Sequence, residues 1–97
     1  MVIKKSNQYK SELKIILENI AKDKISAMQR FRKELNIQIK NIPNMPYKYR
    51  KSTYFEEENT RDMIYKGYTI VYEIFNNYVE IQMIFNQNLP ILEDKFI

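Results

Sequence analysis

Glu73 and Glu80 come closest, in residue type and spacing, to a pair that could do acid–base chemistry. Each lies three residues from the Asn76-Asn77 pair, so a two-residue turn there places the two carboxylates opposite each other on neighbouring strands. Such a pair could act as general acid and base, but opposed carboxylates on a solvated sheet face are far more often surface residues. Because like charges directly opposite weaken a sheet, they could instead receive basic side chains from a partner. We therefore take Glu73 and Glu80 as partner-binding candidates and assign no catalytic residue.

Composition excludes most other catalytic chemistry. The chain has no cysteine and no histidine, which rules out disulfides, thiolate nucleophiles, the usual zinc sites and any imidazole acid or base. We therefore expect no metal ion and no cofactor.

Basic residues are concentrated in the first half of the chain. Residues 1–51 carry 13 Lys and Arg against 4 Asp and Glu, whereas residues 52–97 carry 3 against 8, so the two parts have net charges of +9 and −5. A basic half suggests a nucleic acid or an acidic protein as partner, although a solvated helix surface gives the same pattern. Between residues 43 and 52, basic residues alternate with tyrosines. This alternation suits phosphate contacts and stacking, or a crossover loop whose tyrosines pack over the sheet edge.

Residues 61–85 predict three consecutive antiparallel strands that position these side chains. Lys66-Gly67, with the only glycine of the chain, and Asn76-Asn77, whose asparagines tolerate positive φ, are the two tight turns. The second turn then pairs Ile70 with Met83. Apolar residues share one face of the last two strands: Tyr68, Ile70, Tyr72, Ile74, Val79, Ile81, Met83 and Phe85. The other face is expected to carry Asp62, Ile64, Thr69, Val71, Glu73, Glu80, Gln82 and Ile84.

Two helices are expected before this sheet, preceded by an edge strand at Val2–Lys5. Ser6 is a suitable N-cap for the first helix and Asp23 for the second. Only residues 21–24 separate them, which predicts an antiparallel helical hairpin. Apolar residues follow helical spacing in both: Tyr9, Leu13, Ile16, Leu17 and Ile20, then Ile25, Met28, Phe31, Leu35, Ile39 and Ile42, until Pro43 ends the second helix.

These elements predict one α+β domain over residues 1–97, in which the N-terminal helical hairpin packs on one face of a small, mainly antiparallel sheet of three to four strands. A short extended piece is expected at 53–55, and the C-terminal tail, 89–97, is expected to be flexible. No segment approaches the ~20 apolar residues of a membrane span, and no secretory signal is recognisable. We therefore expect a soluble, cytoplasmic protein that does not contact a membrane.

The order of these elements and the segments RDMIYKGYTIVYEI and VEIQMIFNQ closely resemble the RelE/ParE superfamily of bacterial toxins from type II toxin–antitoxin systems. Arg61-Asp62, Gly67-Tyr68, Ile70-Val71-Tyr72 and the apolar final strand carry the resemblance, which spans residues 2 to about 88. In this superfamily, RelE-like members cut messenger RNA in the ribosomal A site, whereas ParE-like members inhibit DNA gyrase and are not nucleases.

Three positions depart from the nuclease pattern, so the resemblance favours the ParE-like branch. The nucleases carry an arginine after the Gly-Tyr pair, basic residues on the preceding strand, and a histidine or tyrosine near the end of the last strand. This chain has Thr69, Asp62 and Asn86-Gln87 at those positions. Three carboxylates on the face opposite the helices would repel RNA, and the cations that a developing phosphorane charge requires are missing.

The resemblance implies a toxin that inhibits DNA gyrase by binding, is neutralised by a cognate antitoxin, and oligomerises only through the antitoxin complex. Our candidates for target contacts are Lys48, Arg50, Arg61 and Lys66, although Arg61 could equally be structural and pair with an acidic neighbour. One alternative is a RelE-like, ribosome-dependent mRNA endoribonuclease that uses cations from residues 48–51, with the ribosome and mRNA as partners. The other is an inactive, antitoxin-binding relative. An antitoxin could lay a helix in a groove or add a strand to the sheet edge.

Overall fold

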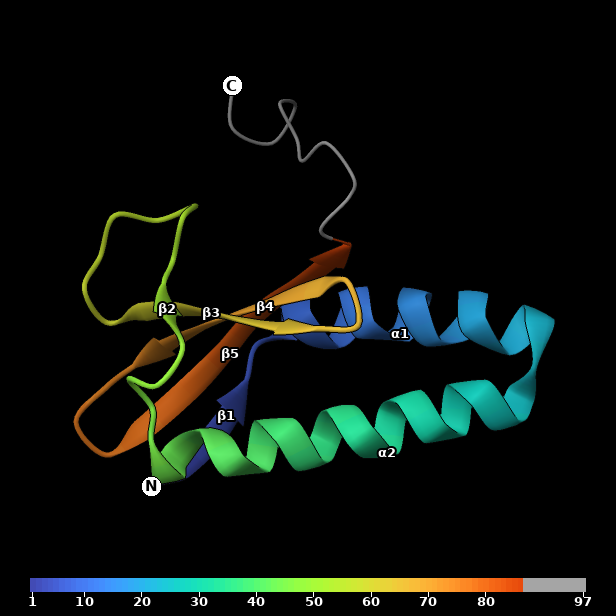
Figure 1. Ribbon diagram of the computed structural model, residues 1–97, viewed down its shortest axis with the longest axis horizontal. Helices are drawn as coiled ribbons and strands as arrows, with labels where there is room; N and C mark the ends of the chain where they lie inside the picture. Colours follow the sequence, from blue (N-terminus) through green and yellow to red (C-terminus); the bar gives the residue numbers. More distant parts are fainter. Residues whose placement is uncertain (87–97) are drawn as a thin grey trace.

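A computed structural model describes residues 1–86 of the chain. Two antiparallel helices lie side by side and cover one face of a five-stranded sheet with the strand order β1-β5-β4-β3-β2 (Figure 1). The elements are β1 (Val2–Lys5), α1 (Asn7–Asp23), α2 (Ile25–Asn41), the 3₁₀ turn η1 (Ile42–Asn44), β2 (Arg50–Lys51), β3 (Thr60–Tyr65), β4 (Tyr68–Ile74) and β5 (Tyr78–Asn86). Neither helix has the length and apolarity that crossing a membrane requires.

The predicted α+β class is confirmed, with five strands instead of three to four. β1 joins the sheet edge parallel to β5, as its position predicted. The additional strand is β2, which pairs Arg50 with Asp62, so the extended piece predicted at 53–55 was misplaced by a few residues. The prediction for the tail, 89–97, lies outside the described residues.

The helical hairpin is confirmed, but its connection differs from the prediction. The Ser6 hydroxyl accepts a hydrogen bond from the Tyr9 N–H at 3.0 Å, as expected of an N-cap. Asp23, in contrast, does not cap α2, because the Lys24 N–H still donates to the Ile20 carbonyl and α1 continues through Asp23. Lys24 alone, in an extended conformation, turns the chain into α2 without a side-chain cap.

Both predicted hairpin turns occur, with different backbone geometry. Lys66 and Gly67 have φ of 48° and 84°, the left-handed pair that a tight turn between twisted strands requires. The other turn lies at Asn76-Asn77, where the Phe75 N–H donates to the Tyr78 carbonyl at 2.9 Å. The positive φ predicted for the asparagines is wrong, because within residues 1–86 only Lys66 and Gly67 have positive φ.

The register between β4 and β5 changes at a β-bulge, which the prediction missed. Tyr72 pairs with Ile81 as expected, but Val71 pairs with Met83 and Ile70 with Ile84, which leaves Gln82 as an extra residue on β5. The predicted pairing of Ile70 with Met83 is therefore wrong. Ile84 lies in the core beneath the helices and is 1% exposed, instead of on the opposite face.

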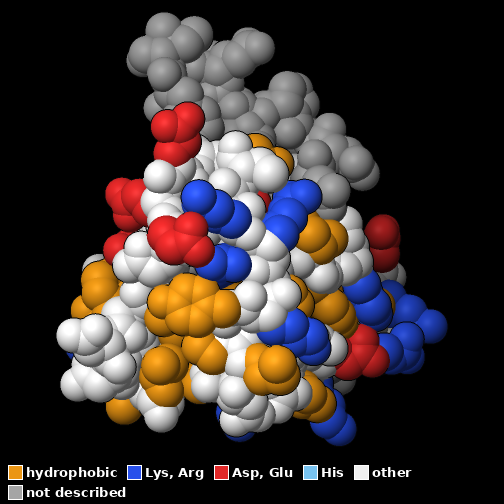
Figure 2. Space-filling view, turned by 60° about the vertical axis from the view of Figure 1, so that its left-hand side comes forward, with side chains coloured by type: hydrophobic (Ala, Val, Ile, Leu, Met, Phe, Trp, Pro, Cys, Tyr) orange, Lys and Arg blue, Asp and Glu red, His pale blue; other side chains and the backbone are white. Residues whose placement is uncertain are grey.

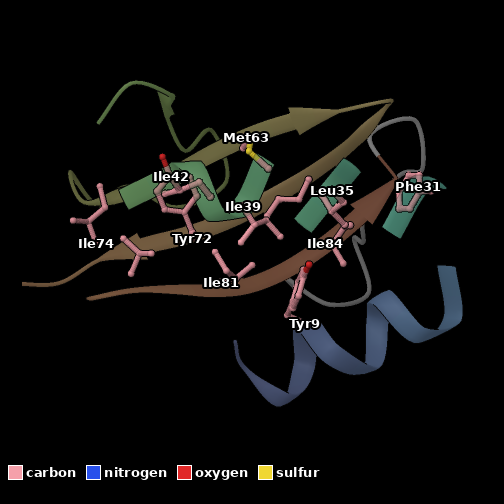
Figure 3. Close-up of a cluster of buried hydrophobic side chains, with 12 residues drawn as sticks. Tyr9, Phe31, Leu35, Ile39, Ile42, Met63, Tyr72, Ile74, Ile81 and Ile84 are labelled. Carbon is pink, nitrogen blue, oxygen red and sulfur yellow. The ribbon is translucent and has the colours of Figure 1, made fainter. Parts of the chain in front are cut away.

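The core is formed by the apolar stripe of α2, by Tyr9 of α1 and by the helix-facing side of the strands (Figure 3). Ile25, predicted to belong to that stripe, is 62% exposed because it lies at the start of α2. Tyr9 is fully buried, its hydroxyl has no hydrogen-bond partner in the described part of the chain, and burial raises its pKa to about 12. The other buried side chains of the cluster are Phe31, Leu35, Ile39, Ile42, Met63, Ile70, Tyr72, Ile74, Val79, Ile81 and Ile84.

We expect Tyr9→Phe to raise the free energy of unfolding by about 1 kcal/mol, because it keeps the ring and removes a buried hydroxyl without a partner. Tyr72→Phe is the matched comparison. The Tyr72 hydroxyl donates to the Pro46 carbonyl, so its removal should lower the free energy of unfolding by about 1 kcal/mol. Urea unfolding of both variants measures the difference, and the same sign for both would contradict this account of the core.

Gly67→Ala should cost about 1 kcal/mol of folding stability. An added Cβ would meet no atom within 4 Å, so the cost comes only from the φ of 84°. Gly67→Asn should cost less, because asparagine tolerates the left-handed region better than alanine. Thermal unfolding of both variants tests this, and an alanine variant as stable as wild type would show that the turn relaxes.

Candidate functional site

Arg61 is the centre of a hydrogen-bonded cluster at the end of the sheet where β3 begins. Its Nε donates to the Glu58 carbonyl at 3.1 Å, its Nη1 to the Tyr49 carbonyl at 3.2 Å, and its Nη2 pairs with Glu58 Oε1 at 2.9 Å. The guanidinium also lies 4.8 Å from the centroid of the Tyr47 ring. Only 12% of the side chain is exposed. Of the two roles expected for Arg61, these contacts favour the structural one.

The loop between η1 and β2 presents the other side chains of this end. Tyr49 packs edge-on against Tyr72, with ring centroids 6.4 Å apart, whereas Met45 and Tyr47 are 64% and 55% exposed. Figure 2 shows Lys and Arg side chains interleaved with hydrophobic ones on this end of the molecule. The two tyrosines of the loop therefore differ: Tyr49 covers the sheet edge, whereas Tyr47 contacts Arg61 and keeps about half of its surface exposed.

Of the predicted contact residues, Lys48 lies on this loop and Arg50 is the first residue of β2, directly after it. Lys48 is exposed and its Nζ lies 5.4 Å from the Tyr49 ring centroid. Arg50 is 47% exposed, and its Nη2 lies 3.5 Å from Asp62 Oδ2. We call Met45, Tyr47, Lys48 and Arg50 the loop surface. Sequence reasoning found its cations and missed Met45, because a single methionine between prolines carries no pattern.

Lys66, the remaining predicted contact, lies at the other end of β3, in the turn to β4. Its Nζ pairs with Glu34 Oε1 of α2 at 2.9 Å, and the Tyr65 hydroxyl donates to the same oxygen at 2.8 Å. The hydrogen bond to Glu34 raises the pKa of Lys66, and the hydrogen bonds from Lys66 and Tyr65 lower the pKa of Glu34. The fold thus separates Lys66 from the loop surface.

The face opposite the helices is partly covered by residues 52–55. Asp62 is 1% exposed, and its Oδ2 accepts a hydrogen bond from the Thr53 N–H at 3.2 Å in addition to the ion pair with Arg50. The Tyr54 ring packs edge-on against Phe85, with centroids 5.2 Å apart. Asp62 was predicted to be one of three carboxylates on an open face. That prediction is wrong, since its charge is buried and paired.

Glu73 and Glu80 are opposite each other, as predicted. The bulge residue Gln82 lies between them, and its Nε2 donates to Glu73 Oε1 at 2.7 Å and to Glu80 Oε1 at 3.4 Å. Neither carboxylate forms an ion pair within residues 1–86. In the same part of the chain, no three His, Cys, Asp or Glu side chains lie close enough together to hold a metal ion. The pair can accept a basic side chain. Lys4 of β1 is paired with Glu80 in the sheet, but its Nζ lies 4.2 Å from the Tyr78 ring centroid and forms no ion pair with either carboxylate.

Comparison with known proteins bears on the family and the fold of the chain. Residues 3–88 match the family described as "ParE toxin of type II toxin-antitoxin system, parDE". No curated protein matches the chain. A solved structure described as "Chromosomal ParDE TA system from P. aeruginosa" has the same fold, with a TM-score of 0.72 and 11% sequence identity over 89% of this chain and 95% of that one.

At this identity the structural likeness shows the fold alone, whereas the family match spans nearly all of the described residues. The ParE-like resemblance seen in the sequence is therefore confirmed. The chain belongs to the family of ParE toxins of type II toxin–antitoxin systems.

Proposed function

We propose that this toxin inhibits DNA gyrase by binding to it, and that a cognate antitoxin neutralises the toxin. The main support for the proposal is that the sheet face opposite the helices is partly covered and carries two carboxylates. Residues 52–55 cover Asp62, and the carboxylates of Glu73 and Glu80 occupy the part beside it with only the Gln82 amide between them. A protein with this face is suited to binding, and the ParE-like toxins that the sequence resembles act on gyrase.

The chemistry of RNA cleavage argues against the RelE-like alternative. Attack by the 2′-hydroxyl requires a proton acceptor, a proton donor and cations beside the phosphorane. The guanidinium groups of Arg50 and Arg61 are already engaged, Arg50 with Asp62 and Arg61 with Glu58. Lys4, the sheet partner of Glu80, has its Nζ over the Tyr78 ring. Releasing the two guanidinium groups would leave the buried Asp62 carboxylate without its cation, at a considerable cost in stability.

The loop surface is our candidate for the gyrase contact. It combines two exposed apolar side chains, Met45 and Tyr47, with the cations Lys48 and Arg50, and tyrosine and arginine are enriched among residues that dominate binding energy. Arg61 acts as a positioning residue, because it stacks on Tyr47 and holds the Tyr49 carbonyl. Lys66 remains a candidate for a second, separate contact, and Glu73 and Glu80 for a contact with basic side chains of the antitoxin.

The target is tested with purified toxin and gyrase. We expect the toxin to inhibit ATP-dependent supercoiling of relaxed plasmid, and its induction in bacteria to arrest growth with DNA damage signalling. Translation arrest with codon-position-dependent mRNA cuts would instead establish the RelE-like function. Unaffected growth in the absence of an antitoxin would identify an inactive relative.

The contact surface is tested with Lys48→Ala combined with Arg50→Ala. Truncation of two dominant contacts should raise the toxin concentration for half-inhibition of gyrase by about tenfold or more. Lys22→Ala with Lys24→Ala, at the tip of the helical hairpin, removes the same charge far from the loop in sequence and should leave inhibition unchanged. Thermal unfolding must accompany the assay, because Arg50 also pairs with Asp62. Full inhibition by a folded Lys48/Arg50 variant would show that gyrase binds elsewhere.

A further inference from the structure

Four cations line a groove of about 510 Å³ between α1 and α2 on the helical hairpin. Lys10 and Lys14 lie on α1, Arg32 lies on α2, and Lys5 is at the end of β1. All four residues are exposed, and none forms an ion pair within residues 1–86. Among the described residues that line the groove, Glu18 is the only acidic one. We call the four residues the hairpin cations. Four positive charges and one negative charge give the groove a net charge of +3.

Elsewhere in the fold, the cations of β2, of β3 and of the turn after β3 already have carboxylate partners. Ion pairs engage Arg50, Lys51, Arg61 and Lys66. An external anion that approached these side chains would have to compete with those carboxylates. The hairpin cations have no such competitor in the described residues, so an anionic partner can bind them without breaking an ion pair of the toxin.

The hairpin cations are spread along the groove and do not gather around one point. Lys10 and Lys14 are one helical turn apart, which corresponds to about 6 Å along the axis of α1. Arg32 lines the groove from the other wall, and the axes of packed helices are about 8–10 Å apart. A small anion cannot contact all of these side chains at once, whereas a polymer with a regular repeat of negative charges can.

Duplex DNA is the polymer whose charge suits this surface best. It carries one negative charge per about 1.7 Å of its axis, and it releases condensed counterions when protein cations replace them. An extended acidic peptide has at most one charge per about 3.4 Å, so the same cations release fewer counterions from it. Phosphate contacts require exposed cationic side chains and no specific pocket, and the hairpin cations are of this kind.

We propose that this toxin also binds duplex DNA, and that the hairpin cations contact the phosphates without reading the base sequence. This activity goes beyond the proposed function, because it requires neither gyrase nor an antitoxin. If gyrase is the target, the same contact keeps the toxin close to an enzyme whose substrate is DNA.

The test is a fluorescence-anisotropy titration of a labelled duplex with full-length toxin, at salt concentrations between about 50 and 200 mM. Four phosphate contacts should weaken binding by about a hundredfold over this range. Lys10→Gln, Lys14→Gln and Arg32→Gln together should lower the slope of log K against log salt by about 2 to 3, and weaken binding at the lower salt concentration by about tenfold or more. Glutamine has a helix propensity close to those of lysine and arginine, so the helices are retained.

A matched variant removes the same charge elsewhere. Lys48→Gln, Lys51→Gln and Lys66→Gln together should leave the salt slope unchanged and the affinity within about threefold of wild type, because Lys51 and Lys66 are already paired. Equal losses for the two triple variants would show that only net charge matters, and a loss confined to the matched variant would place the DNA on the loop side. Either result would overturn the proposal.

A gain of affinity separates a direct role of the groove from loss of folding. Glu18→Gln removes the one carboxylate that lines the groove and should tighten DNA binding by about twofold or more. A variant that merely unfolds cannot bind more tightly than wild type. Binding that does not tighten would overturn the assignment of the phosphates to this groove.

The kind of partner is tested by competition. Polyglutamate at the same concentration of charge should displace the duplex at least about tenfold less effectively than unlabelled DNA, because it releases fewer counterions. Equal displacement would identify the partner as an acidic protein surface and overturn the proposal, as would a strong preference for one of two unrelated duplex sequences. These measurements contain no gyrase, so their failure leaves the proposed target standing. DNA binding by a toxin that does not inhibit gyrase would retain this inference alone.

Discussion

One extra residue in β5, Gln82, decides which side chains face the helices and which face away. Because of the bulge, Ile84 enters the core beside Ile70, and Phe85 moves to the opposite face, where it receives the Tyr54 ring. The same residue connects three parts of the fold. Its carbonyl accepts from the Ser6 hydroxyl at the start of α1, and its amide bridges Glu73 and Glu80. The core, the position of α1 and the acidic pair thus depend on a single irregularity.

Asp62 has a comparable role for the sheet face opposite the helices, because it holds the chain that covers this face. A buried carboxylate requires compensating charge and hydrogen bonds. Arg50 and the Thr53 N–H provide them at Oδ2, whereas Oδ1 has no hydrogen-bond partner in the described part of the chain. To reach Asp62, residues 50–53 must run beside β3, which forms the short strand β2. A basic residue at position 62, as in the nuclease pattern, would leave Arg50 and the Thr53 N–H without the carboxylate that accepts from them. The residue that departs from the nuclease pattern is therefore also the one that helps to close the face.

Much of the fold could be predicted because local patterns determine it. Helical spacing fixes the two helices, and Gly67 fixes the tight turn between β3 and β4. The bulge could not be predicted, since Met83, Ile84 and Phe85 are all apolar and fit the core face in either register. β2 has two residues, too few for a periodic pattern. In each case the outcome depends on partners that are distant in sequence.

Prediction of the candidate site from the sequence meets the same limit. The alternation of tyrosines and cations indicated the loop. Which tyrosine is exposed depends on Tyr72, which packs against Tyr49, and on Arg61, whose guanidinium lies over the Tyr47 ring. Tyr72 and Arg61 lie on β4 and β3, and the loop sequence alone does not show that these strands contact it. Arg61 was selected as a basic residue, and only its contacts show that it positions other residues.

The fold also distributes the charge imbalance between the two halves of the chain. Acidic residues of the second half reach back to the first, where Asp62 pairs with Arg50 and Glu58 with Lys51. Arg50 and Lys51 are thereby paired, whereas Lys48 forms no ion pair in the described residues. Lys10, Lys14 and Arg32, which line the groove between α1 and α2, likewise form no ion pair in the described residues, so the fold itself compensates the charge of the first half mainly next to β3.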